Sequence, residues 1–130
     1  RRHVRSARSY LRLGAVMNID TVLNAYVECA LWSSTDHNDE PMDSGYELSA
    51  SAREAMRADV ADFLRANDET LTASGLSLEQ IGRDFWLTRN RHGTGFWDRG
   101  IGDIGRKLTE AAHVYGSCDL YVGDNGEVYV

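Results

Sequence analysis

The chain has 130 residues, of which 42% are hydrophobic and 26% charged, with a single proline. This composition predicts one globular domain and excludes a disordered or fibrous protein. No apolar run approaches the roughly 20 residues of a membrane helix, so we expect no membrane association. Cys29 and Cys118 lie far apart and form no CxxC pair, which favours reduced thiols in an intracellular protein over a disulfide.

The charge is unevenly distributed along the chain. Residues 1–16 hold five arginines and no acid, whereas residues 17–130 hold nine basic and 20 acidic residues, a net charge of −11 against −6 for the whole chain. We expect 1–16 to be a basic, flexible extension before a single domain at 17–130. A nucleic-acid arm and a stretch upstream of a start at Met17 are the alternatives. The acidic body would repel phosphates, and it suits a basic protein surface or simple solubility.

The first predicted elements are two helices separated by an acidic loop. Apolar residues at helical spacing predict a helix over 21–32, capped by Asp20, and residues 33–48 are polar and acidic. Ser51 and Glu54 form a potential capping box for a second helix that ends near Asn67. The buried stripe of that helix is expected to comprise Ala52, Met56, Val60, Phe63 and Leu64. A short helix around Leu71 should follow.

The aromatic-rich middle of the chain predicts a hairpin. Residues 85–87 form a short apolar run and 96–97 a second one, and the loop between them is basic and rich in glycine. Apolar residues over 101–115 then keep helical spacing up to Gly116, a suitable C-terminal cap.

The last segment predicts a second hairpin. Residues 119–122 and 127–130 flank Asn125-Gly126, a favoured two-residue turn. That turn would place Val122 opposite Tyr129. Together the elements predict an α+β fold, with a small antiparallel sheet of about four strands in two hairpins and three or more helices packed mainly on one face.

The predicted first hairpin carries the best candidate binding site. Arginines beside aromatic rings suit a phosphate, a carboxylate or an unstacked base. The alternative is a structural hairpin whose rings are core and whose arginines pair with Asp84 and Asp98. The candidate residues are Arg89, Arg91, His92, Trp97, Asp98 and Arg99.

Other motifs predict little chemistry. Residues 100–105 match GxGxxG, but no βαβ unit surrounds them, so a nucleotide site is not expected. His92 and Asp98 could act as a base and its orienting carboxylate, yet no recognised nucleophile motif accompanies them. The spacing in 36–40 fits no zinc or calcium signature. We therefore expect no catalytic residues, no metal site and no cofactor.

Three segments resemble a known family. They are GRDFWLTRNRHGTGFWDRG at 82–100, AYVECALWSS at 25–34 and YGSCDLYVGD at 115–124. These segments are similar to small phage-encoded proteins of unknown function, a family with no assigned site residues. The resemblance implies a phage or prophage accessory protein in the cytoplasm of a bacterial host.

The leading functional hypothesis is therefore a non-enzymatic phage accessory protein that binds a host protein through its acidic surface, with a host defence or nucleic-acid enzyme as the kind of target that such binding would inhibit. One alternative is nucleic-acid or nucleotide binding through the 89–99 loop. The other is a small enzyme that uses His92 and Asp98.

Overall fold

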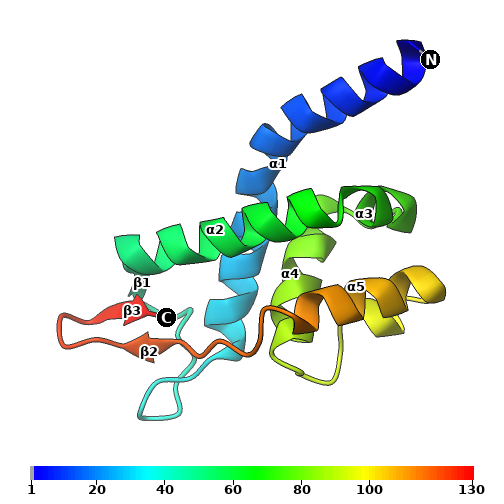
Figure 1. Ribbon diagram of the computed structural model, residues 1–130. Helices are drawn as coiled ribbons and strands as arrows, with labels where there is room; N and C mark the ends of the chain where they lie inside the picture. Colours follow the sequence, from blue (N-terminus) through cyan, green and yellow to red (C-terminus); the bar gives the residue numbers. More distant parts are fainter. Residues whose placement is uncertain (1) are drawn as a thin grey trace.

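The computed structural model describes the backbone of residues 2–130 and the side chains of residues 18–130. Five α-helices dominate the fold, with one 3-10 turn and three very short strands (Figure 1). In chain order the elements are α1 (Arg2–Ser33), β1 (Glu47–Leu48), α2 (Ala50–Ala66), α3 (Asp68–Ser74), α4 (Leu78–Arg89), η1 (Phe96–Asp98), α5 (Asp103–His113), β2 (Tyr121–Val122) and β3 (Glu127–Tyr129).

The closest helix pair is α1 and α4. A Cβ atom on Gly82 would lie 2.3 Å from the backbone oxygen of Val22, so only glycine lets the two helices approach this closely at that point. Tyr26 of α1 and Trp86 of α4 then meet edge to face, with ring centroids 5.4 Å apart. The indole N–H of Trp86 donates to the Ser33 hydroxyl at 2.9 Å, which satisfies the polar atom of a buried ring.

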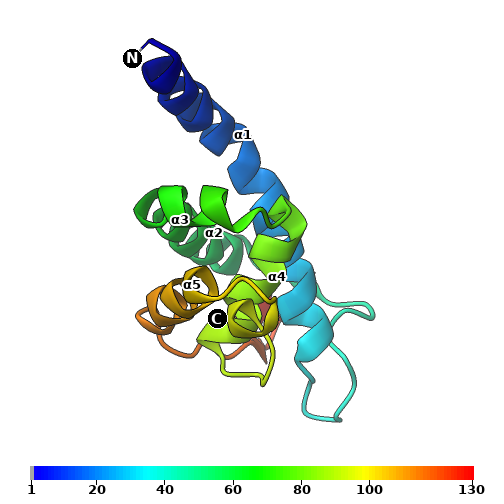
Figure 2. The same cartoon turned by 90° about the vertical axis from the view of Figure 1, so that its right-hand side faces the viewer.

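Aromatic side chains from separate elements form the centre of the core. Phe63 of α2 stacks on Phe85 of α4, with centroids 4.1 Å apart, and Phe96 of η1 lies 5.8 Å from Phe63. All three rings are fully buried. This cluster joins α2, α4 and η1. Figures 1 and 2 show α2 and α4 packed against the C-terminal half of α1.

The sheet is small and mixed. Its strand order is β1-β3-β2, in which β1 pairs with β3 in parallel and β2 pairs with β3 antiparallel. The sheet lies on one side of the molecule, and α3 and α5 lie on the other (Figure 1). Val128 is fully buried in the middle of β3, so one sheet face belongs to the core.

The predicted four-stranded antiparallel sheet with two hairpins is wrong. Residues 85–87 lie inside α4, and 96–98 form a 3-10 turn. The Ser77 hydroxyl accepts from the backbone N–H of Gln80 and caps the start of α4. Within this helix, Ile81, Phe85 and Arg89 follow one another every four residues and lie on one buried face. A three-residue aromatic run was too short to distinguish a buried helix from a strand.

The terminal hairpin exists, but its predicted register is shifted by one residue. Tyr121 pairs with Tyr129, and Val122 pairs with Val128. Gly123 and Glu127 close a three-residue loop, 124–126, whose last residue, Gly126, is left-handed at φ 80°. Since side chains alternate along a strand, the extra loop residue places Tyr121 and Tyr129 on the same face, whereas the predicted register would place them on opposite faces.

Two helix starts also differ from expectation. Asp20 lies within α1 and pairs with Arg57 of α2 instead of capping a helix. The cap of α2 is Ser49, whose hydroxyl accepts from the backbone N–H of Ala52 at 3.1 Å. The expectation of a flexible extension over 1–16 concerns side chains that lie outside the described residues, although the backbone of α1 is helical from Arg2.

Candidate functional site

Arg89, a predicted binding residue, is part of the core. Its side chain is 5% exposed and donates hydrogen bonds to four acceptors on α1, α2 and the end of α5. These acceptors are the Tyr26 hydroxyl (3.0 Å), Asp59 Oδ2 (2.8 Å) and the backbone oxygens of Tyr115 and Gly116 (both 2.9 Å). The guanidinium also lies 5.7 Å from the centre of the Phe85 ring. A side chain with this many internal partners is not available to a ligand.

Arg99 and Asp98 are also engaged within the fold. Arg99 forms a two-point ion pair with the fully buried Asp84, with N–O distances of 2.6 and 2.9 Å. Asp98 accepts from the Thr94 hydroxyl at 2.9 Å and from the backbone N–H of Gly95, and these hydrogen bonds hold the pKa of its carboxyl below its usual value. Both residues fix the turn around η1.

Besides Asp98, which is exposed although its carboxylate is hydrogen-bonded, three of the predicted site residues face solvent. Arg91 is exposed in the left-handed region at φ 54°, His92 is exposed, and Trp97 is 55% exposed. The structure therefore divides the six candidates into residues engaged within the fold and residues open to a ligand. Burial excludes Arg89 as a binding residue, and the ion pair with Asp84 excludes Arg99. The hydrogen bonds described for Asp98 do not include one to His92, as the predicted base and carboxylate would require.

His92 and Cys118 contribute to one polar pocket of about 300 Å³. The Asn90 side chain accepts from the backbone N–H of Cys118 at 2.8 Å and sets the wall of this pocket. Burial raises the pKa of the Cys118 thiol, so the thiol stays protonated at neutral pH. A nucleophilic cysteine needs a lowered thiol pKa, because the thiolate is the reactive form. Cys118 in this pocket therefore does not meet that requirement for catalysis.

The remaining motifs have no ligand-binding context. The 100–105 glycines span the link from η1 to α5 and the first turn of α5, with no strand directly before them as a dinucleotide fold requires. Among residues 18–130, no three His, Cys, Asp or Glu side chains are placed to hold a metal ion. Within the described part of the chain, no helix is both long and apolar enough to span a membrane.

One end of the molecule has a charge pattern unlike the rest. We name residues 34–49 and 117–130 the acidic end; they hold five and three acids respectively, and no Lys or Arg. Elsewhere the chain has 12 acids and 14 Lys or Arg, so the net negative charge arises entirely from the acidic end. Its acids are Asp36, Asp39, Glu40, Asp43, Glu47, Asp119, Asp124 and Glu127.

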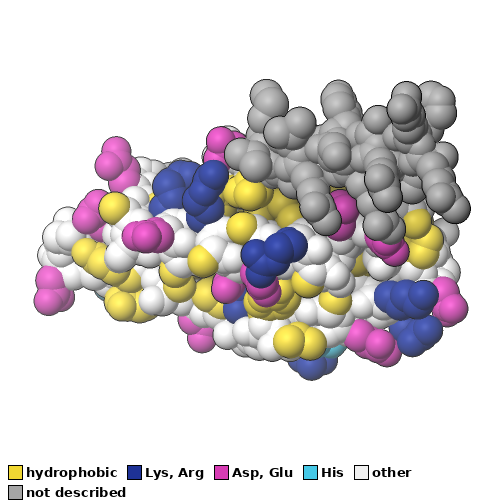
Figure 3. Space-filling model, turned by 45° about the horizontal axis from the view of Figure 1, so that its top comes forward, with side chains coloured by type: hydrophobic (Ala, Val, Ile, Leu, Met, Phe, Trp, Pro, Cys, Tyr) yellow, Lys and Arg dark blue, Asp and Glu magenta, His cyan; other side chains and the backbone are white. Residues whose placement is uncertain are grey.

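The carboxylates of the acidic end have no basic partners among residues 18–130, where the structure describes side chains. Ion pairs there engage acids of the helices instead. Asp36 accepts from the backbone N–H of Glu40 and the Tyr46 hydroxyl and thereby shapes the loop. Figure 3 shows acidic side chains projecting at its left end, and most of the visible Lys and Arg lie further right.

A groove of about 550 Å³ adjoins this acidic loop. We name it the Trp32 groove, because Trp32, at the end of α1, is 69% exposed beside it. Asp43 of the acidic loop and Glu28 of α1 supply carboxylates, and Arg83 supplies one cation. The apolar lining comes from Leu31, Leu87 and Cys29. An exposed tryptophan above an apolar floor is typical of a protein contact surface.

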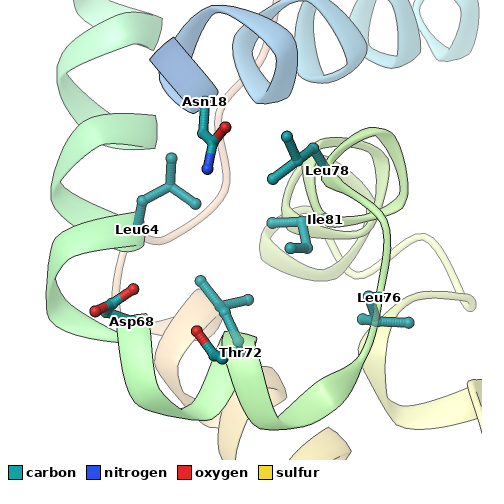
Figure 4. Close-up of a pocket in the computed structure, with 8 residues that line it drawn as sticks. Asn18, Leu64, Asp68, Thr72, Leu76, Leu78 and Ile81 are labelled. Atoms are coloured by element: carbon teal, nitrogen blue, oxygen red, sulfur yellow. The ribbon is translucent and has the colours of Figure 1, made fainter. Parts of the chain in front are cut away.

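A smaller cavity of about 190 Å³ lies where α1, α2, α3 and α4 converge (Figure 4). Leu64, Leu78 and Ile81 point into it, and the Asn18 amide approaches it from α1. Asp68 stands at its side. Its lining is mainly aliphatic and offers few polar groups to orient a ligand, so we interpret it as a packing gap between helix ends.

No protein-family model matches this chain, and no curated protein or solved structure is significantly similar to it. The acidic end is therefore established from this chain's own sequence and structure, and the Trp32 groove from its structure. Sequence reasoning identified the acidic body but missed the concentration of its charge. That signal was readable, since two stretches of the chain simply lack Lys and Arg.

Proposed function

We propose that the protein is a non-enzymatic phage accessory protein that binds a basic protein in the cytoplasm of its bacterial host. The carrying observation is the acidic end, whose eight carboxylates have no Lys or Arg within their own segments. A concentrated field of one sign accelerates association with a surface of opposite sign and rejects surfaces of like sign.

The Trp32 groove supplies what charge alone does not. Electrostatic attraction contributes mostly to association rate and specificity, whereas a buried aromatic anchor slows dissociation. Trp32 is exposed next to Leu31 and Leu87 and borders the acidic loop at Asp43. A partner that places an apolar side chain in this groove, with Lys or Arg around it, would satisfy both features.

The experiment is affinity capture from host lysate, followed by titration calorimetry with the purified captured protein. The test variant is Asp39→Asn/Glu40→Gln/Asp43→Asn, which removes three charges from the acidic end. Its matched control is Glu54→Gln/Asp103→Asn/Glu110→Gln, which removes three charges from exposed helical positions. We expect the test variant to weaken binding at least tenfold and the control less than threefold.

Trp32→Ala forms the second arm and should weaken binding at least tenfold without changing the salt dependence. The affinity of the parent complex should fall steeply between 0.05 and 0.5 M NaCl, because salt screens the attraction between the acidic end and a basic partner. Equal losses in the test and control variants would show that only the net charge matters. Failure of the parent to retain any single protein at low salt would refute the proposal.

A further inference from the structure

The β2–β3 hairpin presents two chemically different faces. Val122 and Val128 pair across the strands on the core side, and Val128 is fully buried. Tyr121 and Tyr129 pair on the other side, with ring centroids 5.8 Å apart and planes inclined by 22°. Tyr121 is 55% exposed, so a stacked aromatic pair faces solvent.

This aromatic pair is held in place by its own turn. A Cβ atom on Gly123 would lie 2.4 Å from a ring carbon of Tyr129, so the ring packs against the glycine in space that any larger residue would fill. The Asn125 amide donates to the Tyr129 hydroxyl at 3.0 Å and to Glu127 Oε1 at 2.8 Å. A ring fixed before binding loses little conformational entropy when a ligand covers it.

Carboxylates lie beside the aromatic pair on the same sheet. Glu47 of β1 is the backbone partner of Glu127 of β3, and Glu127 lies two residues before Tyr129, on the same face. Like charges directly opposite on neighbouring strands destabilise a sheet. Among residues 18–130, neither carboxylate has a Lys or Arg within 4.0 Å, and Glu127 accepts only from the neutral Asn125 amide, so no described cation balances the two charges.

We propose that this face, formed by Tyr121, Tyr129, Glu47 and Glu127, docks an arginine-bearing segment of the protein partner. The inference rests on the proposed function and names the chemistry of the contact. A guanidinium stacks on an aromatic ring and donates to carboxylates with its N–H groups, so one arginine can use both features of the face. A purely apolar partner would instead desolvate two carboxylates, and a nucleic acid would bring phosphates toward them.

The experiment uses the full chain and three blocked peptides, Gly-Arg-Gly-Arg-Gly, its Lys analogue and its Glu analogue. The readout is the shift of the tyrosine ring resonances in aromatic carbon–proton spectra during titration. We expect the arginine peptide to bind at least threefold tighter than the lysine peptide, and the glutamate peptide to cause no shift. Tyr121→Ala should weaken arginine-peptide binding at least fivefold.

Three further variants keep the test decisive. Tyr121→Phe retains the ring and should bind within twofold of the parent, whereas Glu47→Gln should weaken binding at least threefold. Trp97→Ala removes an equally exposed ring outside the sheet and should change nothing. Equal affinity of arginine and lysine peptides, or an unaffected Tyr121→Ala protein, would overturn the inference. So would tighter binding of a single-stranded oligothymidine that shifts the same rings.

The outcomes separate this inference from the proposed function. If Tyr121→Ala retains the host partner and the neutralised acidic loop loses it, the docking face is wrong and the proposed function stands. If the arginine peptide binds at Tyr121 but no host protein is captured, the docking face stands and the proposed function fails.

Discussion

The acidic end and the rest of the molecule, which we call the helical body, differ in how their charged side chains are paired. In the body, Arg89 and Arg99 are folded against carboxylates and aromatic rings, and each joins elements distant in sequence. At the acidic end, carboxylates project without basic partners among residues 18–130. Paired charges specify the fold, whereas unpaired charges contribute little to it and remain available to another molecule. This difference separates the charged residues that stabilise the fold from those on which the proposed binding function rests.

The largest expected effects lie in the aromatic core. Ala substitutions at Phe85, Trp86 and Phe96 should each lower the free energy of unfolding by about 3–5 kcal/mol, because all three rings are buried. Trp97→Ala should cost less than about 1 kcal/mol, since that ring is largely exposed. Urea unfolding of the four variants measures this. A large loss for Trp97 would mean that its ring is covered in solution.

Arg89 should show the next largest effect. Arg89→Met removes all four hydrogen bonds and deprives the buried Tyr26 hydroxyl of its Arg89 partner, so it should lower the free energy of unfolding by about 3 kcal/mol. Arg91→Ala is the matched control, because Arg91 is exposed, and it should change stability by less than about 0.5 kcal/mol. Similar losses from both variants would erase the distinction between body and surface arginines.

Within the acidic end, backbone geometry and not charge should control stability. Gly126→Val places a β-branched residue at φ 80° and should cost about 1–2 kcal/mol. Gly126→Asn, which tolerates the left-handed region, should lose clearly less. Thermal melting of both variants gives the comparison. Equal melting temperatures for parent and Gly126→Val would show that the three-residue loop is not formed in solution.

Alkaline pH should weaken the body. Burial raises the pKa of the Cys29 thiol from about 9 to about 11, so the unfolded chain loses this proton first. The free energy of unfolding should therefore fall from about pH 9 to about pH 11, by up to about 1.4 kcal/mol per pH unit. The Cys29→Ala protein should show a shallower decline between pH 9 and 10. An identical slope would mean that the thiol titrates normally.

The smallest expected effect tests the unpaired charges directly. Asp43→Asn/Glu47→Gln should raise the free energy of unfolding by about 0.5 kcal/mol or less at low salt, because it relieves repulsion between exposed carboxylates. The gain should vanish in 0.5 M NaCl. A clear loss of stability would show that these carboxylates have structural partners, and the contrast between the two regions would fail.

Local patterns predicted several elements well and failed where tertiary packing decided. The buried stripe of α2 and the short α3 followed from apolar spacing, and the terminal hairpin followed from its turn residues. Taken alone, the apolar run 85–87 predicts a strand. It belongs to the helix that starts at Leu78, and only the longer stretch from Leu78 shows the helical spacing of its apolar residues. The predicted hairpin register is wrong because Asn125-Gly126 suits both a two-residue turn and the end of a three-residue loop.

The candidate site was less predictable, because the sequence does not say which arginines are buried. Arg89, Arg91 and Arg99 follow one another closely in a basic, aromatic segment, yet just one of them, Arg91, is fully exposed. The sequence pattern also does not show that Trp32 and Tyr121 face solvent, and the three-dimensional structure does. The charge asymmetry of the acidic end, in contrast, needs no structure to detect.

The position of Arg89 also bears on how the domain opens. Its acceptors belong to α1, α2 and the end of α5, so none of these can detach from α4 without breaking a bond to the same guanidinium. Helices joined in this way open as one cooperative unit rather than singly. Their most protected amide protons should therefore exchange with solvent at a common rate, while the acidic loop exchanges independently and faster.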